Sequence, residues 1–132
     1  MNYQFTINGT MPNLNDLIQA ERQQIRVAGK FTTKGNELKQ KYQNIAIFFI
    51  RQQLRGMSIE KPIYIKYCFY EPNKKRDLDN ISAFAHKIIQ DAMVKSGLIA
   101  NDGWKHIIGF SDEFAVDKEN PRIEVELVEV GD

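Results

Sequence analysis

Residues 63–70 constrain the fold of this chain more than any other segment. Their odd-numbered positions hold Ile, Ile, Tyr and Phe, and their even-numbered positions hold Tyr, Lys, Cys and Tyr. Because successive side chains of a β-strand point to opposite faces, a strand built from this segment is substantially apolar on both faces. A strand of this kind belongs in the interior of a sheet rather than at an edge. Pro72 and Asn73 then end it with residues typical of a turn.

The most regular helical pattern in the chain follows that strand. Apolar residues recur at three- and four-residue intervals from Ile81 to Met93, and Gly97 stands where the residue just beyond a helix C-terminus is expected. A second amphipathic helix, from about residue 36 to residue 55, is predicted from the same spacing earlier in the chain: Leu38, Tyr42, Ile45 and Phe49.

The other predicted elements are shorter. Strands are expected over residues 3–7, 106–110 and 122–127, and residues 29–35 form a loop or a bend between helices. The resulting order, β-α-α-β-α-β-β, predicts an α/β fold: a single domain over residues 1–132, with a small mixed sheet of about four strands covered by helices. The first helix follows Asn13, a suitable N-cap, and carries Leu14, Leu17, Ile18 and Ile25.

The composition is that of a soluble globular protein, with 42% hydrophobic and 27% charged residues among 132. This length suits one domain. No apolar run is long enough for a membrane span, and no secretory signal opens the chain. The single cysteine, Cys68, cannot form an internal disulfide and is interpreted as a small buried hydrophobic residue. We therefore expect a cytoplasmic protein with no membrane partner.

The net charge of +1 conceals two segments of opposite sign. Residues 20–55 hold eight Lys and Arg against two acids, whereas residues 111–132 hold eight acids against two basic residues. Charge runs are usually solvated faces, but a basic one also attracts phosphate backbones. The residues expected to contact nucleic acid are Arg51 and Arg55 in the basic segment and the cluster Lys74, Lys75 and Arg76.

Asp77 and Asp79 follow that basic cluster directly. In an extended backbone, residues with this spacing point to the same face, so both carboxylates can hold one ion if the helix starts after them. Asp102 lies in a turn beyond the helix, where the chain could fold back toward the pair. Clustered carboxylates suit Mg²⁺, and bound Mg²⁺ suits phosphoryl chemistry. The alternative is structural: Asp79 caps the helix and Asp77 is a solvated loop charge.

Several segments resemble the RusA-type Holliday-junction resolvases, small endonucleases common in prophages. They are residues 7–15 (INGTMPNLN), residues 77–81 (DLDNI), the helix end (DAM, then GLI) and residues 101–104 (NDGW). The resemblance implies that Asp77, Asp79 and Asp102 are the catalytic aspartates and that the protein acts on branched DNA as a homodimer. Mg²⁺ is the expected cofactor, with Mn²⁺ as a substitute. The family often has two adjacent acids at the last motif, where this chain has Asn101 before Asp102.

The resemblance also implies a catalytic lysine on the helix after Asp79. In the family that lysine stands one helical turn before Lys87, at the position of Ala83 in this chain. Lys87 shares the helix face of Asn80, and its long side chain could reach a scissile phosphate. The alternative is an ion pair between Lys87 and Asp91, four residues further on.

Five other residues are candidates for roles at this site. Asp91 is interpreted as a structural residue, with a further metal ligand as the alternative, and Asp112 could approach the site from the next strand. His86 and His106 have no partner at metal-ligand spacing and are interpreted as core or surface histidines. Trp104 could stack on an unpaired base, but burial at the edge of the core is the expected position for a lone tryptophan.

The aspartates and basic clusters, read together with the resemblance, predict a Mg²⁺-dependent endonuclease; the resemblance implies that it resolves Holliday junctions in DNA recombination and repair by hydrolysing phosphodiesters. No glycine-rich phosphate loop precedes a helix, so no nucleotide cofactor is expected. Two rival functions remain open. One is another metal-dependent phosphohydrolase, such as a flap nuclease. The other is a metal-independent junction-binding or structural DNA protein whose carboxylates serve as helix caps.

Overall fold

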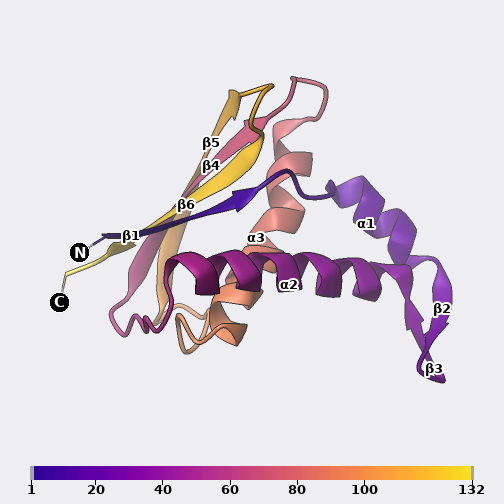
Figure 1. Ribbon diagram of the computed structural model, residues 1–132, viewed down its shortest axis with the longest axis horizontal. Helices are drawn as coiled ribbons and strands as arrows, with labels where there is room; N and C mark the ends of the chain where they lie inside the picture. Colours follow the sequence, from indigo (N-terminus) through magenta and orange to yellow (C-terminus); the bar gives the residue numbers. More distant parts are fainter. Residues whose placement is uncertain (1, 132) are drawn as a thin grey trace.

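The computed structural model describes residues 2–131 and has the predicted α/β architecture, with a mixed sheet (Figure 1). One β-hairpin is added to the predicted order. In chain order the elements are β1 (Asn2–Asn8), α1 (Leu14–Glu21), β2 (Gln24–Val27), β3 (Lys30–Thr33), α2 (Lys34–Gln53), β4 (Ile63–Glu71), α3 (Leu78–Lys95), β5 (Ile107–Val116) and β6 (Arg122–Glu129).

The main sheet has the strand order β1-β6-β4-β5. Strand β4 lies between β6 and β5, which confirms the interior position predicted from its two apolar faces. β4 pairs in parallel with β5 and antiparallel with β6, and β1 pairs antiparallel with β6. Helix α3 connects the two parallel strands. Its N-terminus therefore follows the end of β4, and its C-terminus precedes the start of β5 (Figure 1).

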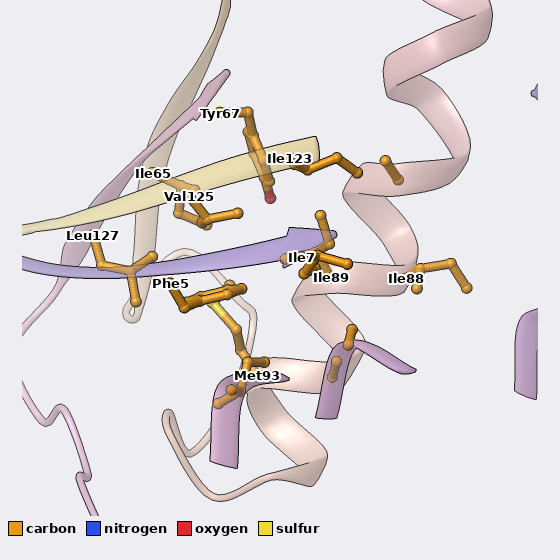
Figure 2. Packing of buried hydrophobic residues seen from close by; sticks show 14 of the residues in the cluster. Phe5, Ile7, Ile65, Tyr67, Ile88, Ile89, Met93, Ile123, Val125 and Leu127 are labelled. Atoms are coloured by element: carbon orange, nitrogen blue, oxygen red, sulfur yellow. The ribbon is translucent and has the colours of Figure 1, made fainter. Parts of the chain in front are cut away.

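The hydrophobic core lies between one face of this sheet and the helices. Figure 2 shows sheet residues such as Phe5, Tyr67 and Val125 pointing toward Ile89 and Met93 of α3, and each of these side chains is at most 1% exposed. The apolar stripe predicted for α3 is the buried stripe observed. The opposite face of the sheet has no helix over it within residues 2–131 (Figure 1). Cys68 lies on that face and is half-buried, not fully buried as expected.

The ends of the helices largely follow the predicted signals. Asn13 caps α1 through a capping box with Asp16, and Gly97, just beyond the C-cap of α3, has the positive φ of 83° that favours glycine there. Helix α2 begins and ends two residues before its predicted bounds. Within residues 2–131, no helix combines the length and the apolarity that crossing a bilayer requires.

The first helix is shorter than predicted. It ends at Glu21, and Ile25 lies in β2 of a hairpin formed by residues 24–33. The prediction of a loop or bend at residues 29–35 is therefore wrong. Backbone hydrogen bonding between β2 and β3 outweighs the helical spacing of Ile25, because Gly29 allows the tight turn that joins two short strands.

Candidate active site

Asp77 and Asp79 lie at the N-terminus of α3. Asp77 is the N-cap residue, with extended backbone angles (φ −71°, ψ 151°), and its carboxylate accepts no capping hydrogen bond. Asp79 lies in the first turn, where its Oδ1 accepts a hydrogen bond from the backbone N–H of Asn80 at 3.0 Å. The helix thus begins between the two aspartates rather than after both. The cap position belongs to Asp77, not to Asp79 as the structural alternative required.

Both carboxylates are available to a ligand. Asp77 and Asp79 are exposed, and neither forms an ion pair within the described part of the chain. The N-terminus of a helix carries a partial positive charge, which stabilises negative charge at this position. Two carboxylates without ion pairs in the described residues therefore lie at the N-terminal end of α3. The helix starts between them, so the condition set from the sequence for both to face one ion, a helix that starts after Asp79, is not met, and only Asp77 of the two lines the groove beside this helix end.

An open groove of about 950 Å³ runs beside this helix end. Asp77 and Lys74 line it from the loop, and Asp112, Phe114 and Val116 line it from β5. The structure thus brings Asp112 toward Asp77, as considered from the sequence. However, its Oδ1 lies 2.7 Å from Nε2 of a histidine on α3, so this carboxylate already has a partner.

That partner is His86, which the sequence left isolated. Its ring packs against Tyr67 and Phe110, with centroid separations of 4.7 and 4.6 Å. Burial raises the pKa of the Tyr67 hydroxyl well above its usual range, and this hydroxyl accepts a hydrogen bond from Gln90 at 3.2 Å. The pairing of His86 with Asp112 joins a helix to a strand 26 residues further on. No local spacing in the sequence signals it.

The three residues of the basic cluster, Lys74, Lys75 and Arg76, differ in their surroundings. The Arg76 guanidinium donates two hydrogen bonds of 2.9 Å to the carboxylate of Glu71 and a third, of 2.7 Å, to the carbonyl of Met11. These bonds attach the loop to the end of β4 and to the N-terminal segment. Lys74 and Lys75 are exposed, so they are the members of the cluster whose charge is open to a polyanion.

Asp102 lies at the opposite end of α3 from Asp77 and Asp79. The helix has 18 residues and therefore separates its two ends by about 27 Å. Backbone hydrogen bonds from Ile59 to Leu98 and from Ile63 to His106 hold the Asp102 loop against the start of β4. Figure 1 shows the connection from β4 to α3 at the top of the view and the connection from α3 to β5 at the bottom. The expectation that the chain folds Asp102 back toward the pair is wrong for a single chain, because the straight helix holds them apart.

Within residues 2–131, no three acidic, histidine or cysteine side chains gather into a group that could hold a metal ion. Arg51 and Arg55 lie at the same end as Asp102. They line a second groove, of about 1130 Å³, with Gly97 and Leu98. The sequence-predicted site residues thus form two half-sites: Asp77, Asp79, Lys74 and Lys75 at one end of α3, and Asp102, Arg51 and Arg55 at the other.

Lys87 belongs to neither end. Its Nζ lies 3.2 Å from Oδ1 of Asp91, and Oδ2 of Asp91 accepts a hydrogen bond from Gln43 of α2. This is the ion pair that formed the alternative to a catalytic lysine. Lys87 does not line the groove beside Asp77. Its catalytic role stays a prediction, and its geometry favours the ion pair.

Strand β5 is an edge of the sheet and presents apolar side chains to solvent. Ile108, Phe110 and Val116 are each about half exposed. Trp104, just before this strand, is 95% exposed, so the expectation of a buried tryptophan is wrong. The backbone N–H of Gly103 bonds the Asn101 side chain in a turn that holds Trp104 away from the core. A long apolar edge of this kind is suited to pairing with another strand.

Comparison with known protein families gives a match. The family model described as endodeoxyribonuclease RusA matches residues 16–128 of the 132-residue chain. The chain belongs to the RusA endodeoxyribonuclease family. No curated protein matches it.

Membership of the RusA family identifies the chain as an endonuclease of the Holliday-junction type. The matched residues include both half-sites, and they also include the hairpin of residues 24–33.

Proposed function

We propose that this RusA-family chain is a Mg²⁺-dependent endonuclease that cuts four-way DNA junctions as a symmetric homodimer. The proposal rests on Asp77 and Asp79, which are exposed and without ion pairs in the described residues. The donor set fits the ion, since Mg²⁺ in proteins is usually bound through one or two carboxylates together with substrate phosphates. The exposed Lys74 and Lys75 beside the pair would draw those phosphates in.

A second chain supplies the missing carboxylate in this proposal. Strand β5 begins five residues after Asp102 and ends at Val116, which lines the groove beside Asp77. Its ten residues span about 33 Å, close to the length of α3. If two β5 edges lie antiparallel about a two-fold axis, Asp102 of the partner subunit approaches Asp77 and Asp79. The exposed apolar residues of this edge support such a contact.

Each residue then has a stated task. When bound, Mg²⁺ polarises the phosphoryl oxygens and makes water a stronger nucleophile. Asp77, Asp79 and Asp102 of the partner subunit would hold the ion, and Lys74 and Lys75 would hold the DNA backbone. A dimer with two such sites would place two nicks symmetrically across a junction whose own symmetry is close to two-fold.

Mixed dimers test the shared site. Asp77→Asn and Asp102→Asn proteins, each inactive alone, are mixed and allowed to exchange subunits. In a shared site, one of the two sites of the mixed dimer keeps all three native aspartates, so nicking of a four-way junction returns. If all three aspartates acted within one chain, each site of the mixed dimer would carry a substitution and no nicking would return.

The matched control mixes Asp77→Asn with Asp79→Asn. Both substitutions lie in the same half-site, so each site of that mixed dimer is damaged and no recovery is expected. Recovery in the control, or none in the first mixture, would contradict the shared site. Full cleavage by either Asp77→Asn or Asp79→Asn alone would remove that residue from metal binding.

The second candidate function is a metal-independent junction-binding protein, and it is favoured by the absence of a three-ligand cluster within residues 2–131. A metal-independent junction-binding protein should show no rise in melting temperature with Mg²⁺, whereas binding to the folded state raises it with concentration. Linear duplex and flap substrates, incubated beside the four-way junction, separate the proposal from the flap-nuclease rival.

A further inference from the structure

Residues 24–33 form an arm that projects from the body of the protein. They make a two-stranded sheet of their own, β2 with β3, at one end of the long axis of the molecule, with the main sheet at the other end (Figure 1). None of these residues belongs to the hydrophobic core. Phe31 is 66% exposed, although an aromatic side chain of this size is ordinarily buried. Core packing therefore does not explain this segment.

The base of the arm is fixed. Thr33 caps α2 by accepting a hydrogen bond from the backbone N–H of Asn36 at 3.1 Å, and its hydroxyl donates to Glu21 at 3.1 Å. The Glu21 carboxylate also forms a 3.0 Å ion pair with Lys39, and the Lys34 backbone N–H donates to the Gln23 carbonyl. The arm is thus held between the end of α1 and the start of α2.

The tip of the arm is a two-residue turn under strain. Ala28 has a φ of 52° and Gly29 a φ of 80°, the pattern of a type I′ turn, which matches the twist of the flanking strands. Ala28 is the one non-glycine residue with positive φ that the structure records within residues 2–131. Alanine tolerates this conformation poorly, and strained backbone of this kind is concentrated at functional positions.

The arm carries charge of one sign. Residues 22–34 contain four basic side chains and no acid. The Arg26 guanidinium lies 4.7 Å from the centre of the Phe31 ring, directly across the hairpin. The nearest acid along the chain, Glu21, is already paired with Lys39. Glu37 of α2 lies beside the base of the arm, but none of the four basic side chains forms an ion pair within the described residues. The surface therefore combines positive charge without ion pairs and an exposed aromatic side chain.

We infer that this arm binds the branch point of a DNA junction, with its basic side chains on the phosphates and Phe31 stacked on an unpaired base. The inference rests on the proposed function. Phosphates explain the charge, and only a branch or another interruption of the duplex offers an unstacked base face to an aromatic ring. A continuous duplex leaves Phe31 without a partner of this kind.

The test compares the binding of a four-way junction with that of a linear duplex of the same sequence, in EDTA so that nothing is cut. Phe31→Ala should weaken junction binding about tenfold, the scale of losing one base–aromatic contact, and change duplex binding less than twofold. Phe31→Trp should keep junction affinity. The matched control is Ile18→Ala, since Ile18 is an apolar residue that is 42% exposed on α1, outside the arm and outside both grooves, and it should not change the preference for the junction.

The charges of the arm are tested separately. Arg26→Gln with Lys30→Gln should weaken binding to both DNA forms and make the dependence of log affinity on log salt concentration shallower by about one to two. The control double variant, Lys61→Gln with Lys66→Gln, removes two exposed charges elsewhere and should leave the slope unchanged.

The outcomes separate the two proposals. Wild-type protein that neither prefers nor cuts the junction overturns the proposed function. Wild-type protein that binds and cuts it, with Phe31→Ala unchanged, overturns only the arm. Equal losses on junction and duplex would also overturn the arm's role at a branch point, because the ring would then contact ordinary duplex.

Discussion

Arg76 and Lys75 are neighbours in the chain with different surroundings. Arg76 satisfies the carboxylate of Glu71, which is 6% exposed, whereas Lys75 is exposed to solvent. Arg76→Ala leaves this buried carboxylate without its partner. We expect a loss of about 2–4 kcal/mol in the free energy of unfolding by urea, less than for a wholly buried pair because the guanidinium is partly exposed.

Lys75→Ala is the matched control for that change. It should alter the free energy of unfolding by no more than about 0.5 kcal/mol and instead weaken DNA binding in a salt-dependent manner. Arg76→Ala could instead leave stability unchanged and weaken only DNA binding. That result would favour the role expected from the sequence, contact with DNA, over a structural role for the Arg76–Glu71 pair.

Lys87 offers a second prediction at this scale. Its side chain is 68% exposed and pairs with Asp91 at i,i+4, an arrangement that stabilises a helix by about 0.3–0.5 kcal/mol. Lys87→Ala should therefore lower stability by about that amount and change the junction cleavage rate only a few-fold. A fall of about 10²-fold in the rate, with the fold intact, would instead favour the catalytic lysine.

At the scale of elements, patterns with many repeats were predictable and short ones were not. The stripe from Ile81 to Met93 repeats over several turns, so it fixed α3 and the face of that helix that is buried. Strands β2 and β3 have only four residues each, so their alternating pattern is too short to outweigh the helical spacing that groups Ile25 with the apolar residues of α1. The signal that could have revealed them was Ala28-Gly29 between β-branched and aromatic residues, a short hairpin signature.

The same turn gives a prediction. Ala28→Asn places a residue that tolerates positive φ at the strained position, so the hairpin should gain about 0.5–1 kcal/mol of local stability. Slower amide hydrogen exchange across residues 24–33 would show this gain. Ala100→Asn, at an exposed position outside the helices and strands, is the control and should leave exchange in the arm unchanged. Faster exchange in Ala28→Asn would contradict the type I′ assignment.

At the scale of the whole molecule, the sequence could mark three candidate aspartates but not their arrangement in space. Motif spacing marks Asp77, Asp79 and Asp102 without recording the direction of the helix between them. Once α3 forms as a straight helix of 18 residues, its ends cannot meet within one chain. In the proposed dimer the third aspartate comes from a second chain. The surface features that support such a contact, the exposed apolar residues of β5 and the exposed Trp104, exist only in the folded structure.

The proposed shared site would couple metal binding to assembly. Without a metal, two aspartates of one chain and one of its partner would repel each other across the proposed interface, and Mg²⁺ would remove that repulsion. A ligand that binds only the dimer must strengthen dimerisation. At a Mg²⁺ concentration of about 100 times its dissociation constant, two equal sites would tighten the dimer by about 10⁴-fold.

Light scattering over a dilution series, with and without Mg²⁺ at constant ionic strength, measures this coupling. The dimer dissociation constant should fall with Mg²⁺ for the wild type, but much less for Asp102→Asn, because that variant lacks the carboxylate that the partner contributes. Ile108→Lys places a charge on the β5 edge, where Ile108 is 51% exposed, and should yield monomers that remain folded. A wild-type dissociation constant that does not depend on Mg²⁺ would contradict a metal site shared between two chains.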